Sequence, residues 1–166
     1  IESYDELVTY AQRAQLFRNI YGQFSERVTV SKDAFDEKFV GRGALFADYD
    51  DDGDMDLGVT SSGRQFSLLR NDGGNSNNWL KVKLEGITSN RDAVGALVEV
   101  WTDKNRQIQQ VKAGSGYQSS NPKLLHFGLG KKNMVDSLRV LWPSGILHVL
   151  PKVESGRLVT VVENQP

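Results

Sequence analysis

Five aspartates at alternate positions form the stretch of this chain whose residue types and spacing best fit a chemical role. They lie between residues 48 and 56, and Gly53 stands at the sixth place of the run. Calcium takes six to eight oxygen ligands from carboxylates, carbonyls and water, and a glycine lets the backbone turn sharply without a Cβ penalty. Because carboxylates packed this closely would otherwise repel one another, the pattern predicts a calcium-binding loop. The predicted metal ligands are Asp48, Asp50, Asp52, Asp54 and Asp56.

Each predicted ligand has a role in this interpretation. The first three aspartates supply side-chain oxygens, Asp54 supplies its backbone carbonyl, and Asp56 closes the coordination shell. The alternative is a solvated acidic turn that holds no ion.

An EF-hand loop has a similar run of acidic residues, but it needs a bidentate Glu at its twelfth position. Here that position is Val59. Residues 44–47 and 57–59 are predicted to be short buried strands rather than capped amphipathic helices. The loop is therefore expected between two β-strands.

Composition sets limits on the rest of the chain. The formal net charge is -1 and no five basic residues run together. The sequence therefore has no basic segment of the kind that binds nucleic acid or an anionic membrane. No apolar stretch approaches the roughly 18 residues of a membrane-spanning helix. Cysteine is absent, which excludes disulfides and thiol catalysis. Sixteen glycines and many β-branched residues favour an all-β chain.

A weak internal repeat organises the first half. Residues 16–19 (LFRN) recur as residues 68–71 (LLRN), and repeats of about 40–50 residues built from short strands indicate propeller blades. An alternative for the N-terminus is a short helix, because Leu7, Tyr10, Ala11, Ala14 and Phe17 have helical spacing.

Turn-forming residues at 71–78 predict a boundary between a blade region, residues 1–76, and a second domain, residues 77–166. In the second domain short strands separated by turns predict a small antiparallel β-sandwich or barrel. In residues 79–84 alternation places Leu80, Val82 and Leu84 on one face and Lys81 and Lys83 on the other. The predicted strands are residues 79–84, 96–101, 108–113, 138–142, 146–150 and 158–162.

These pieces resemble two known families. Residues 41–57, GRGALFADYDDDGDMDL, resemble the FG-GAP (VCBS-type) repeat, which forms calcium-loop blades in integrin-like β-propellers. The second half resembles the ASPIC/UnbV domain through an ordered set of stretches: residues 78–84 (NWLKVKL), 89–96 (SNRDAVGA), 114–117 (GSGY), 126–130 (HFGLG) and 142–145 (WPSG).

The resemblance implies a secreted, periplasmic or cell-surface protein and a place at the C-terminal end of a longer chain of blades. It implies a non-catalytic, calcium-stabilised interaction module, because the ASPIC/UnbV domain has no well-defined activity to carry over. The partner would be a protein or a glycan on an extracellular surface. The open edges of an incomplete propeller would be covered by further blades or by a second copy of the chain.

Two other functions remain open. Residues 44–50 also resemble the start of haloacid-dehalogenase-type phosphatases, with Asp48 as nucleophile and Asp50 as acid, but the chain lacks an alternating strand-helix pattern. A carbohydrate-binding module could use Tyr117 and Trp101 as stacking surfaces. His126 and His148, the only histidines, have no triad partner nearby in the sequence.

Overall fold

A computed structural model of the chain describes residues 9–26 and 36–164. Its regular structure consists of strands and one short 3-10 turn, η1 (Gly74–Ser76), so the prediction of an all-β chain is confirmed. No helix in the described residues is long and apolar enough to cross a membrane.

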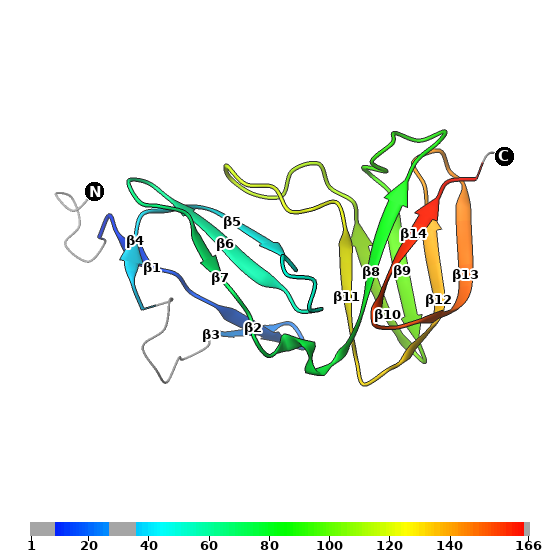
Figure 1. The fold of residues 1–166 in the computed structure, drawn as a ribbon, viewed down its shortest axis with the longest axis horizontal. Coiled ribbons are helices and arrows are strands. Elements are labelled where there is room, and N and C mark those ends of the chain that lie inside the picture. The colour runs from blue at the N-terminus through cyan, green and yellow to red at the C-terminus, as the bar shows by residue number, and fades with distance from the viewer. Residues whose placement is uncertain (1–8, 27–35, 165–166) are drawn as a thin grey trace.

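The described residues of the N-terminal unit form three small antiparallel sheets (Figure 1). Residues 9–26 form strands and turns, so the alternative of a helix through Tyr10, Ala11, Ala14 and Phe17 is wrong there; Leu7 lies outside the described residues. The seven strands are β1 (Gln12–Arg13) with β4 (Lys38–Phe39), β2 (Phe17–Ile20) with β3 (Gln23–Glu26), and β5 (Gly41–Ala47) with β6 (Asp56–Ser61) and β7 (Ser67–Leu69).

The β5–β6 hairpin carries the aspartate run between its strands, as the sequence predicts. The expectation that these strands are buried is wrong in part, because Phe46 in β5 is 52% exposed. The physical reason is that the buried apolar residues of the described chain all lie between residues 80 and 161. Within the described residues, the sheet of β5, β6 and β7 thus contributes no apolar side chain to the buried core.

The C-terminal unit packs two sheets face to face (Figure 1). All strand pairs within them are antiparallel except the pairing of β14 with β8, which is parallel. One sheet has the strand order β10-β9-β12-β13 and consists of β9 (Leu97–Thr102), β10 (Asn105–Gln110), β12 (Met134–Leu141) and β13 (Leu147–Glu154). The other sheet has the strand order β11-β8-β14 and consists of β8 (Asn78–Glu85), β11 (Leu125–Gly130) and β14 (Arg157–Val162).

Alternation of apolar and polar residues builds the core between these sheets. In β8 the side chains of Leu80 and Val82 are fully buried, and in β12 those of Leu138 and Val140 are too. Successive side chains of a strand point to opposite faces, so Leu80 and Val82 share the core-facing side of β8, and Leu138 and Val140 share that of β12. Trp142, immediately after β12, is 2% exposed and belongs to the same cluster.

Strand β10 lies three residues before the position that the sequence predicts. It begins at Asn105 and ends at Gln110, whereas the expected strand covered residues 108–113. Gln107 and Gln109 are part-buried, and their Nε2 atoms donate hydrogen bonds to the carbonyl oxygens of Gly128 and His126 in β11, at 2.7 Å each. Ile108 faces outward and is 49% exposed. Polar side chains therefore connect the two sheets along this edge of the sandwich.

A buried carboxylate fixes the loop after β8. Glu163 is 0% exposed, and its two oxygens accept hydrogen bonds from the backbone amides of Ile87 and Ser89 and from the hydroxyls of Ser89 and Ser144, at 2.6–2.8 Å. Burial raises the pKa of Glu163, but these four donors outweigh it and lower the pKa to about 2. In the same loop Asn90 exchanges two hydrogen bonds with the backbone of Val94. The loop at residues 89–92 therefore has a structural role.

Candidate metal centre

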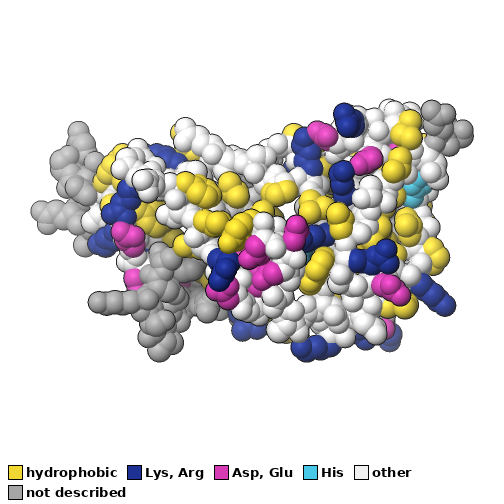
Figure 2. All heavy atoms as spheres, viewed as in Figure 1, with side chains coloured by type: hydrophobic (Ala, Val, Ile, Leu, Met, Phe, Trp, Pro, Cys, Tyr) yellow, Lys and Arg dark blue, Asp and Glu magenta, His cyan; other side chains and the backbone are white. Residues whose placement is uncertain are grey.

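In the structure the loop between β5 and β6 runs from Asp48 to Met55, and Asp56, the last predicted ligand, is the first residue of β6 and pairs with Ala47. Acidic side chains gather near the middle of the face shown in Figure 2, over the end of the β5–β6 hairpin. Two loop residues have left-handed backbone, Asp51 with φ 59° and Gly53 with φ 99°. An aspartate tolerates this conformation better than most residues, and glycine adopts it freely.

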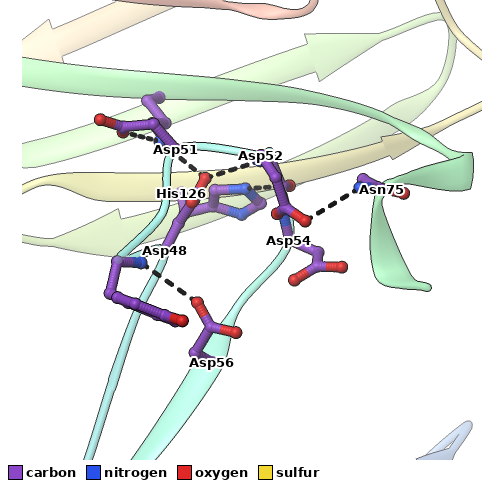
Figure 3. Close-up of polar contacts among 10 residues, drawn as sticks. Asp48, Asp51, Asp52, Asp54, Asp56, Asn75 and His126 are labelled. Atoms are coloured by element: carbon purple, nitrogen blue, oxygen red, sulfur yellow. Dashed lines mark hydrogen bonds and ion pairs between the residues drawn. The ribbon is translucent and has the colours of Figure 1, made fainter. Parts of the chain in front are cut away.

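Hydrogen bonds within the loop hold the carboxylates in place (Figure 3). The Gly53 amide donates to Asp48 Oδ2 at 2.9 Å, and the Tyr49 amide donates to Asp56 Oδ2 at 3.1 Å. Asp56 Oδ1 accepts from the Asn71 amide at 2.8 Å, which ties the loop to the turn after β7. Backbone amides thus hold the carboxylates of Asp48 and Asp56 in position without the help of an ion.

Three of the five predicted ligands lie together. One carboxylate oxygen from each of Asp48, Asp50 and Asp56 lies within 4.8 Å of the other two. The Asp48 side chain is only 2% exposed, and its Oδ1 is buried without a hydrogen-bond partner. A buried unpaired carboxylate oxygen is costly. A hard cation that takes oxygen ligands would satisfy it, so the residues present fit calcium.

The side chains of Asp52 and Asp54 lie outside this group of three. Asp52 Oδ1 accepts from the Asp54 amide at 3.0 Å, and Asp52 Oδ2 accepts from Asn75 Nδ2 at 3.1 Å. Asp54 is buried, with Oδ2 accepting from the Gly74 amide at 2.9 Å. Both residues thus connect the loop to the turn at residues 71–76. Their roles as metal ligands, by side chain and by carbonyl, stay predictions.

The back of the loop contacts the C-terminal unit through residues that the sequence analysis did not connect with the loop. Lys81 Nζ in β8 lies 2.6 Å from Asp48 Oδ2 and 2.8 Å from Asp51 Oδ1. His126 Nε2 in β11 lies 3.1 Å from the Gly53 carbonyl oxygen, and its ring stacks on Trp79 with centroids 5.9 Å apart. A Cβ at Gly53 would lie 1.8 Å from Trp79 Nε1. Only a glycine fits between the loop and this indole.

Opposing effects set the pKa values around the loop. Burial raises the pKa of Asp54, and the charges of Asp52 and Asp56 raise it further, while the Gly74 amide lowers it. The hydrogen bond and charge of Lys81 lower the pKa of Asp51. Burial lowers the pKa of Lys81, but Asp48 and Asp51 outweigh it and the pKa is raised above its usual value. Lys81 is therefore a buried cation that partly compensates the acidic loop.

Other candidate residues have structural partners. His148 lies edge-on to Trp142, and its Nε2 accepts from the Asn164 amide at 3.3 Å. Trp101 is half-buried, with the guanidinium carbons of Arg106 and Arg139 each 5.5 Å from its ring centroid. Stacking arginines occupy the surface that a sugar would need.

Comparison with known protein families finds a match for most of the second half of the chain. Residues 86–166 match the family model "ASPIC and UnbV", in agreement with the resemblance noted for the second half of the sequence. The match begins after β8 and contains the strands β9 to β14 described above.

Relatives of the chain are vertebrate proteins named cartilage acidic protein 1. The human protein is 34% identical over 135 residues, which cover 79% of this chain, and the mouse protein is 33% identical over the same length. The protein of Xenopus tropicalis is 34% identical over 127 residues, or 74% of this chain. The chain spans about a fifth of the length of these relatives. The similarity also reaches upstream of residue 86, because it covers a larger share of the chain than the domain itself.

Proposed function

We propose that this chain is a non-catalytic interaction module stabilised by calcium, and that its first half is an FG-GAP-type blade region of a longer propeller protein. The observation that carries the proposal is the buried, unpaired Oδ1 of Asp48 beside the carboxylates of Asp50 and Asp56. Calcium would neutralise these carboxylates and fix the loop between β5 and β6. The free energy of calcium binding would then add to the stability of the folded state. The similarity to cartilage acidic protein 1 supports a secreted or cell-surface location over a periplasmic one.

Several observations support a binding role over an enzymatic one. His126 and His148 are engaged in contacts with the loop and with Trp142. The antiparallel β5–β6 hairpin differs from the parallel, helix-covered sheet that a haloacid-dehalogenase-type site requires. Trp142 is buried, Trp79 lies under the acidic loop, and arginines stack on Trp101. The positions of the three tryptophans favour a protein partner over a glycan, whereas Tyr117, the other residue of the carbohydrate-binding alternative, is 68% exposed.

Exposed apolar side chains indicate where partners would bind the N-terminal unit. Phe17, Phe24, Phe66 and Leu68 are 46–70% exposed. In a larger protein, further blades would cover these residues, and a second copy of the chain is the alternative. Large exposed apolar surface is uncommon on isolated soluble domains.

Thermal unfolding in excess calcium and in excess chelator tests the metal site. A ligand at 100 times its Kd stabilises the folded state by about 2.7 kcal/mol, which corresponds to a Tm rise of roughly 5–10 °C for a chain of this size. Asp50→Asn keeps the side-chain shape at an exposed position and should abolish most of the rise. The matched control is Asp92→Asn, which removes an exposed carboxylate of the C-terminal unit and should keep the rise. Equal Tm values of the unchanged protein in calcium and in chelator would contradict the proposal.

A further inference from the structure

The side chain of Lys81 joins the acidic loop to the C-terminal unit. Its ammonium lies 2.6 Å from Asp48 Oδ2, and both side chains are almost fully buried, at 5% and 2% exposure. The other oxygen of this carboxylate, Oδ1, is buried and unpaired, and one oxygen of Asp48 lies within 4.8 Å of oxygens of Asp50 and Asp56. Asp48 is thus shared between the candidate metal centre and strand β8.

We infer that Lys81 is a positioning residue which couples cation binding at the loop to the docking of the C-terminal unit. The inference rests on the proposed function, since it requires that a divalent cation binds at Asp48, Asp50 and Asp56. Lys81 and the Gly53 amide together hold Oδ2 of Asp48. With Oδ2 held, the movement of the carboxylate is restricted, and the unpaired Oδ1 is left for the cation to bind.

Coupling follows because each interaction favours the same arrangement of Asp48. A cation bound at Oδ1 holds the loop in its folded form, and the folded loop presents Oδ2 to Lys81 and the Gly53 carbonyl to His126. Docking of β8 and β11 in turn orders the loop, so the loop loses less conformational entropy when the cation binds. Two binding events that share one ordered state must strengthen each other to the same extent.

The charge of Lys81 is compatible with this role. A lysine beside a cation site repels the ion, but Asp51 also pairs with the ammonium, at 2.8 Å, and remains 88% exposed. The carboxylates of the loop and of Asp56, which follows it, outnumber this one ammonium. The net field at the cluster therefore stays attractive to a divalent cation while one carboxylate is held in place.

Hydrogen exchange, measured by mass spectrometry with and without calcium on the full chain, tests the coupling. In the unchanged protein calcium should slow exchange of the loop at residues 48–56 and also of β8 and β11, approaching 100-fold at calcium 100 times above its Kd. In Lys81→Met the loop should still respond to calcium, whereas the slowing in β8 and β11 should fall to less than a third of its unchanged value. Methionine keeps the apolar stem and removes the ammonium.

Lys83→Met is the matched control, because Lys83 lies on the same face of β8, is 54% exposed and pairs with Glu85. It should keep the calcium response of all three segments. A variant that merely destabilises the fold would speed exchange in both buffers without changing their ratio, so the ratio isolates the coupling.

The possible failures are distinguishable. If calcium leaves exchange of residues 48–56 unchanged in the unaltered protein, the proposed metal site fails. If calcium protects the loop but not β8 and β11, the metal site stands and the coupling is refuted without any variant. If Lys81→Met keeps full protection of β8 and β11, coupling does not run through Lys81.

Discussion

Replacing Gly53 by alanine should destabilise the protein through two separable effects. The first is conformational: Gly53 has φ 99°, and left-handed backbone costs an ordinary residue about 1–2 kcal/mol. The second is steric, because the new Cβ would lie 1.8 Å from Trp79 Nε1 and 2.4 Å from its Cε2. The loop must then move off the indole, which weakens the bonds of Gly53 with Asp48 and His126, each worth about 0.5–1.5 kcal/mol.

The expected total is therefore about 2–5 kcal/mol, measured by urea unfolding with circular dichroism in calcium-free buffer. Gly63→Ala is the matched control, since Gly63 has φ 73° but open space where its Cβ would be. It should cost only the conformational part, about 1–2 kcal/mol.

A double-mutant cycle separates the two effects. In a Trp79→Val background the indole is gone, so Gly53→Ala should cost about 1–2 kcal/mol, as Gly63→Ala does. The difference between the two backgrounds measures the steric part. If Gly53→Ala costs the same with and without Trp79, the contact of the loop with β8 does not constrain Gly53 and the reasoning is refuted.

Three further outcomes are expected. Glu163 has a pKa of about 2 in the folded state and 4.5 as its ordinary value, so its contribution to stability is complete above pH 4.5 and is lost as pH falls toward 2; urea unfolding across this range should show less pH dependence in Glu163→Gln. Leu138→Ala should cost about 2–5 kcal/mol, because the side chain is fully buried, whereas Leu147→Ala, 57% exposed, should cost about 0.5 kcal/mol or less in the same assay. Arg106→Ala removes one guanidinium from the ring of Trp101 and should cost less than about 1 kcal/mol, with a change in tryptophan emission; an unchanged spectrum would contradict this stacking.

Local patterns were sufficient to predict much of this fold. Apolar alternation in β8 predicted Leu80 and Val82 as core residues, and both are fully buried. The aspartate spacing predicted a loop between two strands, and β5 and β6 flank it. These predictions succeed because alternation and turn chemistry are properties of neighbouring residues.

Contacts between distant segments could not be predicted in the same way. Lys81 was expected on the polar face of its strand, and it is buried there because the acidic loop covers it. Strand β10 was misplaced because Gln107 and Gln109, although polar, point inward to the carbonyl oxygens of β11. In both cases a polar side chain is buried by a partner from another part of the chain, and periodicity carries no information about that partner.

The parallel pairing of β14 with β8 has a consequence for how the chain acquires its structure. β8 is the first strand of the C-terminal unit and β14 is the last, so this sheet is incomplete until the whole unit has been synthesised. Contacts between residues so far apart in the sequence slow folding, because the entropy of closing a long loop must be lost first. The loop at residues 48–56 leaves the ribosome well before the strand that supports it is secured, and during that interval its carboxylates have no fixed surface to dock on.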